Sequence, residues 1–287
     1  MLETRELTIR FGGHVAVDRV SCEFAPGTLT AIVGPNGAGK TTYFNLISGQ
    51  LKASAGSVWL AGTDITGETV SARTHRGLGR AFQLTQLFRN LSVLENVRLA
   101  VQSRRHEGLS LFAVWLDRSE TLARARDLVE RVRLGDRADA AASSLPHGDQ
   151  RKLEVAMLIA LEPSVYMFDE PTAGMSVDDV PVILDLIRSL KAEADKTILL
   201  VEHKMDVVRE LADRIIVLHN GQLVADGEPA EVIASPIVQQ AYLGLVPEAS
   251  LLVAPEAQLQ TAMGRPPIPA FPLEGEGAAR RGSGDRA

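Results

Sequence analysis

Short apolar runs recur along most of the chain, and segments with apolar residues at helical spacing separate the later runs. Runs in which apolar side chains alternate or follow one another without a break are typical of half-buried or fully buried β-strands. Such runs occupy residues 7–11, 20–24, 29–33, 57–61, 78–82, 165–168, 197–201 and 214–218. The first two alternate and predict an antiparallel, hairpin-like region, while the strands interspersed with helices predict an α/β sheet. Asn220-Gly221, between two apolar runs, is a strong signal for a two-residue hairpin turn.

The middle of the chain has a different pattern. Between Phe88 and Ser144 the strand signal fades and helix-forming residues dominate. We interpret residues 84–160, approximately, as a helical subdomain inserted into a domain that spans residues 1–246.

The composition changes again after residue 246. Six of the 14 prolines lie in residues 247–287, and no helical or strand period persists there. Such a segment cannot bury enough apolar surface to offset the entropy lost on ordering. We therefore expect residues 247–287 to form a disordered C-terminal tail.

Composition and charge narrow the choice of partners. The chain of 287 residues has a formal net charge of −6 and 45% hydrophobic residues, which is ordinary for a soluble α/β protein. Because a negative chain does not attract a nucleic-acid backbone by bulk electrostatics, we expect no nucleic-acid partner. The single Cys22 excludes an internal disulfide. No apolar run approaches the roughly 18 residues of a membrane span, and the start of the chain lacks the apolar segment of a signal peptide. We expect a cytosolic chain, and any membrane role must come through partners.

Residues 34–41 read GPNGAGKT and match the phosphate-binding pattern G-x-x-x-x-G-K-[ST]. A predicted strand precedes this pattern and a helix-compatible segment, 40–48, follows it, which is the context that such a loop requires. Glycines let backbone N–H groups approach phosphates, and the start of a helix favours an anion. We expect Lys40 to contact the β- and γ-phosphates of a nucleotide and Thr41 to bind Mg²⁺ through its hydroxyl. The candidate nucleotide contacts in this loop are Gly34, Pro35, Asn36, Gly37, Ala38, Gly39, Lys40, Thr41 and Thr42.

An acidic pair follows another apolar run. Residues 165–168 are all apolar and lead directly into Asp169 and Glu170, as expected for a central parallel strand that is buried on both faces. The carboxylates of this pair are then predicted to emerge beside the phosphate loop. Asp169 is placed to hold Mg²⁺ through water, and Glu170 to act as the general base toward an attacking water.

A helix is predicted to start near Pro146, since proline suits the first helical turn and the apolar positions that follow have helical spacing. In this stretch, LPHGDQRKLEVAMLIA, the chain resembles the ATP-binding-cassette (ABC) ATPase family, whose signature L-S-G-G-Q opens such a helix. Leu145 and Gly148 match the signature, whereas Pro146, His147 and Asp149 differ from its commonest form. In the family this helix start binds the γ-phosphate held by a second subunit. The resemblance implies a P-loop NTPase fold, a head-to-tail dimer, and ATP contacts from His147 and Gly148.

Two of these differences have electrostatic consequences. Pro146 offers neither a hydroxyl nor an N–H where the commonest signature has serine, and Asp149 adds a negative charge to the first helical turn. We expect Asp149 to cancel part of the field that the helix offers to a phosphate. The isolated chain is therefore expected to dimerise weakly with ATP.

Further residues fall where the family has functional side chains. Gln83 resembles the Q-loop glutamine, which senses Mg²⁺ and water and touches the membrane partner. His203 resembles the switch histidine, which contacts the γ-phosphate and orients the attacking water, although a histidine after a strand is often structural. Residues 173–176 occupy the position of the D-loop, which crosses to the partner subunit. Phe11 lies where the family has an aromatic residue that stacks on adenine; the alternative is that Phe11 belongs to the core.

A finer resemblance concerns the stretches RFGG, FRNLSVLENVRLA, LPHGDQRKLEVAM and DEPTAGMS. They look like ATPase subunits of branched-chain amino-acid importers, a group that also includes urea and short-amide importers, and a lipopolysaccharide-export ATPase is a close cousin. The resemblance implies two membrane-spanning permease subunits and a second ATPase chain as partners, with a solute-binding protein acting indirectly. It places the chain at the cytoplasmic face of the membrane.

The sequence argues against one other functional class, ABC proteins that act on DNA or ribosomes, and leaves a second open. ABC proteins that organise chromosomes insert long coiled coils before the signature, but here only residues 84–144 separate Gln83 from Leu145. Relatives that act on ribosomes carry two cassettes in one chain, whereas this chain has one phosphate loop. A soluble nucleotide-dependent regulator would differ from a transport ATPase only in the proteins that co-purify with it.

Overall fold

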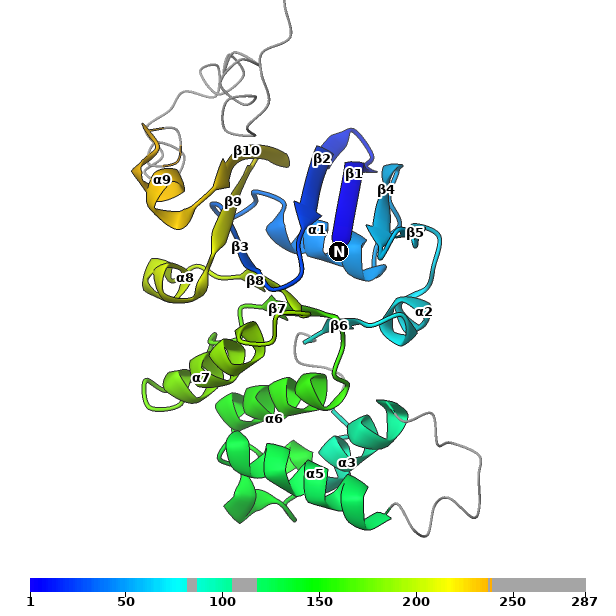
Figure 1. Ribbon diagram of the computed structural model, residues 1–287, viewed down its shortest axis with the longest axis vertical. Coiled ribbons are helices and arrows are strands. Elements are labelled where there is room, and N and C mark those ends of the chain that lie inside the picture. The colour runs from blue at the N-terminus through cyan, green and yellow to red at the C-terminus, as the bar shows by residue number, and fades with distance from the viewer. Residues whose placement is uncertain (82–86, 105–117, 237, 239–287) are drawn as a thin grey trace, which may run out of the picture.

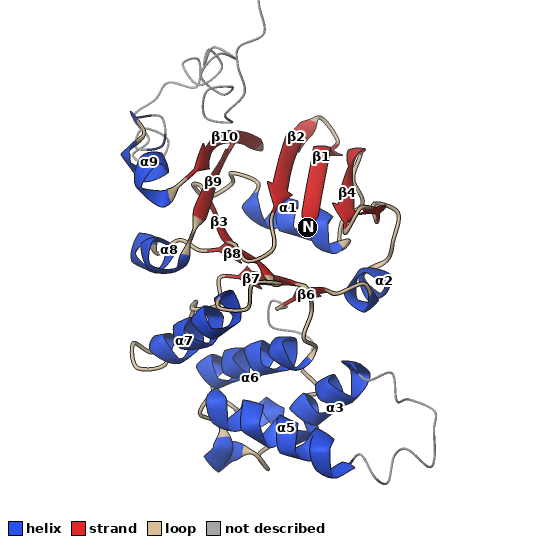
Figure 2. Ribbon diagram, in the orientation of Figure 1, coloured by secondary structure: helices blue, strands red, loops and turns tan. Residues whose placement is uncertain are grey.

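The computed structural model describes residues 1–81, 87–104, 118–236 and 238, and the predicted tail at 247–287 lies outside this part of the chain. The strands of the described residues form two sheets (Figures 1 and 2). An antiparallel sheet has the strand order β2-β1-β4-β5, and a second sheet has the order β10-β9-β3-β8-β7-β6. The strands are β1 (Leu2–Phe11), β2 (His14–Phe24), β3 (Leu29–Val33), β4 (Ala55–Leu60), β5 (Thr63–Asp64), β6 (Leu78–Arg80), β7 (Val165–Asp169), β8 (Thr197–Val201), β9 (Arg214–His219) and β10 (Gln222–Gly227).

Helices cover both sides of the second sheet (Figure 2). The α-helices are α1 (Lys40–Ser48), α2 (Val70–His75), α3 (Val93–Arg104), α5 (Arg118–Arg131), α6 (His147–Ala160), α7 (Val180–Lys191), α8 (Met205–Leu211) and α9 (Pro229–Ala234). Two 3₁₀ turns, η1 (Gly135–Arg137) and η2 (Ala142–Ser144), precede α6. Helices α3, α5 and α6 gather at one end of the molecule, within the stretch that the sequence predicts to be helical (Figure 1).

The second sheet is parallel except at one edge. Strands β6, β7, β8, β3 and β9 pair in parallel, and β10 pairs antiparallel to β9. Every residue of β3, β7 and β8 is buried, which explains why these strands appear in the sequence as continuous apolar runs. The turn between β9 and β10 consists of Asn220 and Gly221, with φ of 47° and 78°, as the sequence predicts for a two-residue hairpin.

The antiparallel sheet begins with the predicted hairpin. Strands β1 and β2 pair along their whole length, from Leu2 opposite Phe24 to Phe11 opposite His14, and so extend beyond the two short runs predicted from alternation. Several register shifts interrupt the pairing, and residues at such bulges break the alternation on which the prediction depends. This explains why the strands are longer than the sequence pattern indicates.

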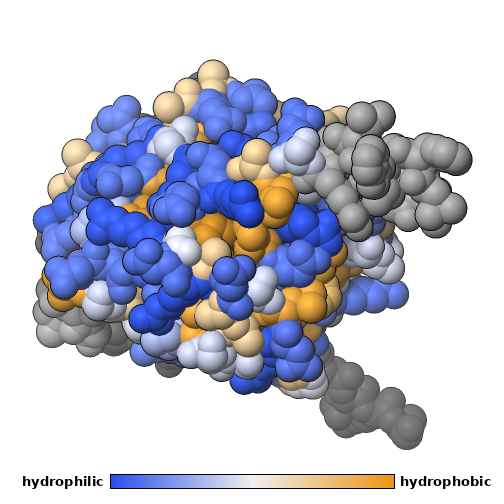
Figure 3. Space-filling view, turned by 90° about the horizontal axis from the view of Figure 1, so that it is seen from below, coloured by the Kyte–Doolittle hydropathy of each residue, from blue (hydrophilic) through white to orange (hydrophobic). Residues whose placement is uncertain are grey.

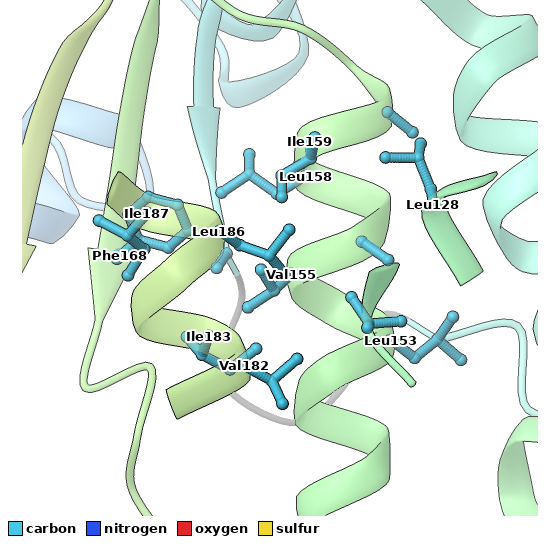
Figure 4. Packing of buried hydrophobic residues seen from close by; sticks show 14 of the residues in the cluster. Leu128, Leu153, Val155, Leu158, Ile159, Phe168, Val182, Ile183, Leu186 and Ile187 are labelled. Atoms are coloured by element: carbon cyan, nitrogen blue, oxygen red, sulfur yellow. The ribbon is translucent and has the colours of Figure 1, made fainter. Parts of the chain in front are cut away.

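Three apolar clusters hold the layers together. One cluster joins α1 to the inner faces of both sheets, with Tyr43 and Phe44 of α1 fully buried. A second lies between the other face of the parallel sheet and helices α3, α5, α6 and α7; Figure 4 shows Ile187 of α7 beside Phe168 of β7. The third packs α8 and α9 against β9. Helix α1, which follows the phosphate loop, is therefore held firmly between two sheets.

The surface of the helical end is mostly hydrophilic, with smaller apolar patches between the polar side chains (Figure 3). Among the described helices, none combines the length and the hydrophobicity needed to cross a membrane.

Candidate functional site

Three strands end side by side at the candidate site. Backbone pairing aligns Ile32 of β3 with Val201 of β8, and Val201 with Asp169 of β7. The loop after β3, the acidic pair at the end of β7 and His203 after β8 therefore leave the sheet at the same edge. Such an edge, at the carboxyl ends of parallel strands, is where open α/β sheets bind ligands.

The phosphate loop is packed against the turn between β9 and β10. A Cβ atom at Gly34 would lie 2.1 Å from the carbonyl oxygen of Leu218, and one at Gly39 would lie 2.5 Å from that of Ala16. These two glycines are therefore required by the packing of the loop itself, a reason that the motif does not reveal. The N–H of Gly221 donates to the carbonyl of Ala38 at 3.0 Å and holds the loop to the hairpin.

Lys40 is buried at the start of α1, with 6% of its surface exposed. Its ammonium donates to the carbonyl oxygens of Gly34 at 2.7 Å and Pro35 at 3.0 Å. Burial lowers the pKa of Lys40, and the negative charges of Glu170 and Asp169 oppose that shift. The remaining loop positions differ in exposure: Asn36, Gly37 and Thr41 are exposed, Pro35, Gly39 and Thr42 are half-buried, and Gly34 and Ala38 are buried.

Asp169 is fully buried at the end of β7. Its Oδ2 accepts a hydrogen bond from Nη2 of Arg80 at 2.9 Å, whereas its Oδ1 is buried without a hydrogen-bond partner. Burial raises the pKa of Asp169 above its ordinary value, although the charge and hydrogen bond of Arg80 lower it. A carboxylate oxygen left without a hydrogen-bond partner fits a hydrated Mg²⁺, which binds through oxygen ligands and keeps several waters.

Glu170 stands on an unusual backbone. Its φ is 50°, in the left-handed region that costs a residue other than glycine about 1–3 kcal/mol. The conformation is held from two sides: the N–H of Glu170 donates to the carbonyl of Val201 at 2.9 Å, and the buried guanidinium of Arg151 donates to the carbonyls of Asp169 and Glu170. This backbone directs the Glu170 carboxylate toward His203.

The side chains of Glu170 and His203 are in direct contact. Nε2 of His203 lies 2.8 Å from Oε1 of Glu170, and the two side chains are 41% and 33% exposed, respectively. Because a carboxylate only accepts hydrogen bonds, the proton of this contact is assigned to Nε2. The predicted general base and the predicted switch histidine thus form one pair, open to solvent, at the sheet edge.

Glu202 holds the backbone around this pair. It is 3% exposed, and its Oε1 accepts from the hydroxyl of Thr172 at 2.6 Å while its Oε2 accepts from the N–H of His203 at 3.0 Å. It therefore ties the loop after β8 to the loop after β7. Sequence reasoning missed Glu202, Arg80 and Arg151. For Glu202 and Arg80 the available signal was a charged residue inside or directly after an apolar segment; Arg151 lies in a polar stretch and has no such signal.

The signature segment departs from expectation in two details. Pro146 is the residue before α6, with φ −56° and ψ 156°, and not part of its first turn. Asp149 is paired with Nη1 of Arg137 and with Nζ of Lys152, at 2.6 Å in both cases. These two cations offset the charge of Asp149, which reduces the cancellation of the helix field that the sequence leads us to expect.

The start of α6 lies against the loop after β7. A Cβ atom at Gly174 would be 3.1 Å from Nδ1 of His147, and one at Gly148 would be 3.8 Å from the carbonyl of Gly174. Lys152 also reaches Asp179 at 2.9 Å, and Asp179 accepts from the hydroxyl of Ser176 at 2.7 Å. The signature and D-loop segments of one chain are thus joined.

Two predicted site residues remain. Phe11 is 50% exposed, which excludes the alternative of a core residue and leaves its ring available for stacking. Gln83 lies outside the described residues.

Comparisons with known proteins identify the class. The family model described as "ABC transporter" matches residues 17–173. The high-affinity branched-chain amino acid transport ATP-binding protein LivG of Escherichia coli (strain K12) is 37% identical over 85% of this chain and 98% of its own length. The corresponding protein BraF of Pseudomonas aeruginosa is 35% identical with the same coverage.

Solved structures agree with the sequence comparison. A nucleotide-free ATP-binding cassette from an ABC transporter, 30% identical, superimposes with a TM-score of 0.72 over 84% of this chain and 98% of that chain. A dimeric cassette in a post-hydrolysis state with ADP and Pi, 25% identical, has a TM-score of 0.70 over 80% of this chain and 99% of that chain. The fold is that of a P-loop NTPase of the ABC type, with an antiparallel subdomain. The chain belongs to the ABC transporter family, as one of its ATPase subunits.

Proposed function

We propose that this chain is the ATP-hydrolysing subunit of an importer for branched-chain or related amino acids. The similar proteins from Escherichia coli and Pseudomonas aeruginosa carry that transport function in their names. The observation that supports the hydrolytic role most strongly is the 2.8 Å contact between Glu170 and His203 at the edge that also carries the phosphate loop.

Nucleotide binding is assigned to the phosphate loop and its neighbours. The ammonium of Lys40, which donates to two loop carbonyls, is placed to exchange them for oxygens of the β- and γ-phosphates of ATP. The exposed ring of Phe11 would stack on adenine. Thr41 and Gln83 would hold Mg²⁺, and Asp169 would hold it through water; the ion would neutralise negative charge on the phosphates.

Hydrolysis is assigned to the pair at the sheet edge. Glu170 accepts a proton from the water that attacks the γ-phosphorus; a bond forms between the water oxygen and phosphorus, and the bond to the β-phosphate oxygen breaks to give ADP and phosphate. His203 orients Glu170 through the hydrogen bond from Nε2, and through that carboxylate it orients the attacking water. The carboxylate of Glu202 accepts a hydrogen bond from the N–H of His203, and the guanidinium of Arg151 donates one to the carbonyl of Glu170, so both catalytic residues are fixed in place.

ATP would act across a head-to-tail dimer. The first N–H groups of α6, from His147 and Gly148, have no acceptor within the helix and would bind a partner's γ-phosphate. The dimer could be formed by two copies of this chain or by a companion ATPase. The domain that performs these steps is residues 1–246, with residues 84–160 as its helical subdomain.

The membrane partner would dock on the helical subdomain. A groove of about 690 Å³ runs between α2, α3 and α6, and its lining is mainly apolar, with Phe88 53% exposed at its rim. A groove of this kind suits a short amphipathic helix. We assign it to a cytoplasmic helix of a permease subunit, so that dimer closure moves the two permeases. The chain would then work at the cytoplasmic face of the membrane.

Reconstitution tests this proposal. The chain, co-expressed with two permease subunits and a solute-binding protein from the same source, should co-purify with the permeases in detergent. In vesicles, its ATP hydrolysis should rise when the binding protein carries leucine, isoleucine or valine. Stimulation by urea or a short amide in place of these amino acids would refute the substrate assignment, and failure to co-purify with any permease would refute the transport role.

A further inference from the structure

Arg80 lies at the end of β6, and its side chain is 5% exposed. Strand pairing sets Arg80 beside Met167 of β7. Because Asp169 lies two residues beyond Met167 on the same strand, it faces the same side of the sheet as Met167. That side is covered by α1, the helix that begins with Lys40. Arg80 is therefore positioned between the phosphate-loop helix and the aspartate.

The guanidinium of Arg80 joins these two elements. Nη1 donates to Oδ1 of Asn45 at 2.6 Å, to Oγ of Ser48 at 3.0 Å and to Oε1 of Gln50 at 3.1 Å. Nη2 donates to Oδ2 of Asp169 at 2.9 Å. One planar group thus contacts three neutral oxygens at the end of α1 and one carboxylate at the end of β7, a geometry that a single ammonium cannot reproduce.

The contact with Asp169 is asymmetric. Oδ2 is engaged by Arg80, while Oδ1 is buried and has no hydrogen-bond partner. A carboxylate held by one oxygen has its rotation about the Cβ–Cγ bond restricted, so the other oxygen keeps a fixed direction. Oδ1 is therefore the oxygen of Asp169 that still lacks a partner, and a ligand that enters the site would satisfy it.

We propose that Arg80 is a positioning residue for the metal site: it holds Oδ2 of Asp169 so that Oδ1 faces the hydrated Mg²⁺ of the nucleotide, and it sets that carboxylate relative to the helix of Lys40 and Thr41. This inference rests on the proposed role of Asp169 toward Mg²⁺. It assigns Arg80 no contact with ATP, so loss of Arg80 should weaken the Mg²⁺-dependent part of nucleotide binding and spare the remainder.

The test measures the affinity for a non-hydrolysable ATP analogue by calorimetry, in EDTA and across a Mg²⁺ titration. In Arg80→Met, the Mg²⁺ concentration that gives half of the maximal increase in analogue affinity should rise roughly tenfold, which corresponds to about 1.4 kcal/mol. Affinity in EDTA should stay within about twofold of the wild-type value, since Lys40 and the loop are untouched. Arg80→Lys keeps the charge but cannot reach both α1 and Asp169. Its Mg²⁺ requirement should therefore lie between those of the wild-type protein and Arg80→Met.

Arg73 provides a matched control. It is 2% exposed and also donates to the end of α1, at the carbonyls of Leu46 and Ile47, but the contacts of its guanidinium do not include Asp169. Arg73→Met should lower the melting temperature and leave the Mg²⁺ requirement unchanged. Asn45→Ala, a smaller change at the α1 side of the link, should shift the Mg²⁺ requirement in the direction of Arg80→Met with little effect on folding.

The outcomes separate this inference from the proposed function. A folded Arg80→Met with the wild-type Mg²⁺ requirement, or with equal losses of affinity in EDTA and in Mg²⁺, would overturn the positioning role. If instead the wild-type protein binds the analogue equally well with and without Mg²⁺, the metal assignment itself fails. The same follows if Asp169→Asn leaves the Mg²⁺ requirement intact.

Discussion

Charged side chains are buried around the phosphate loop and the acidic pair. Lys40, Arg80 and Arg151 are 6%, 7% and 5% exposed, and burying a charge is costly unless it is paired and hydrogen-bonded. Each has partners: Lys40 uses loop carbonyls, Arg80 uses Asp169, and Arg151 uses Glu154 and the backbone after β7. These buried charges are stabilised by their partners, and each of them holds a functional group of the site in place.

The sequence predicts Lys40, Glu170 and His203 because a motif or a family position marks each one. It does not predict Arg80 or Arg151. A charged residue within an apolar segment indicates that a partner exists, but the partner can lie anywhere in the chain. Here Asp169 is 89 positions from Arg80, and only the pairing of β6 with β7 brings them together.

Replacement of Lys40 by alanine should reduce ATP affinity by roughly 10- to 150-fold, since a charge-assisted hydrogen bond is worth about 1.5–3 kcal/mol. Equilibrium binding of a fluorescent ATP analogue measures this change. Lys52→Ala, which removes an exposed lysine after α1, is the control and should bind normally. Equal affinities for Lys40→Ala and the wild-type chain would contradict the assignment of the loop.

At the scale of elements, the ends of strands and helices determine the geometry of the site. The sequence predicts the strands β3, β7 and β8 well because each is buried on both faces and hence continuously apolar. It predicts less well how their end loops pack, since a glycine in a motif looks the same whether it faces a phosphate or a carbonyl. The close approach of Gly39 to Ala16 is an example.

Replacement of Gly221 by alanine should destabilise the protein and weaken nucleotide binding. Its φ is 78°, and a Cβ atom would lie 2.8 Å from the carbonyl of Ala16, so the turn that holds Ala38 must shift. We expect a loss of about 1–3 kcal/mol in the free energy of unfolding by urea denaturation. Gly12→Ala, also at positive φ but in open space, should lose about 1 kcal/mol and bind ATP normally. Equal effects of the two variants would refute this account of the turn.

The start of α6 carries a prediction about dimerisation. Asp149 is neutralised by Arg137 and Lys152, so the remaining handicap is Pro146, which lacks both a hydroxyl and an N–H. In a Glu170→Gln background, Pro146→Ser should tighten ATP-dependent dimerisation by roughly tenfold, while Pro146→Ala, which restores only the N–H, should tighten it less. Analytical ultracentrifugation measures both. Equal or weaker dimerisation after Pro146→Ser would show that the proline is no handicap.

At the scale of the whole molecule, one helix connects the sheets with the site. Helix α1 is packed between the antiparallel sheet and the parallel sheet, and its start bears Lys40 and Thr41. The resemblance of sequence motifs to ABC ATPases predicts this architecture correctly, because the motifs follow one another in the order that the strands require. It does not reveal the ion pairs that join the signature segment to the D-loop, since those depend on Lys152 lying near both Asp149 and Asp179.

The central claim is that Glu170, paired with His203, is the general base of an ATP-hydrolysing cassette. Its most direct test is the rate of ATP hydrolysis by Glu170→Gln at saturating Mg²⁺-ATP, with ATP affinity measured on the same preparation. General-base catalysis contributes about 10²–10⁴-fold, so we predict a rate at least about 100-fold below wild type with affinity retained. A Glu170→Gln protein that binds ATP normally and hydrolyses it within a few-fold of the wild-type rate would contradict the account.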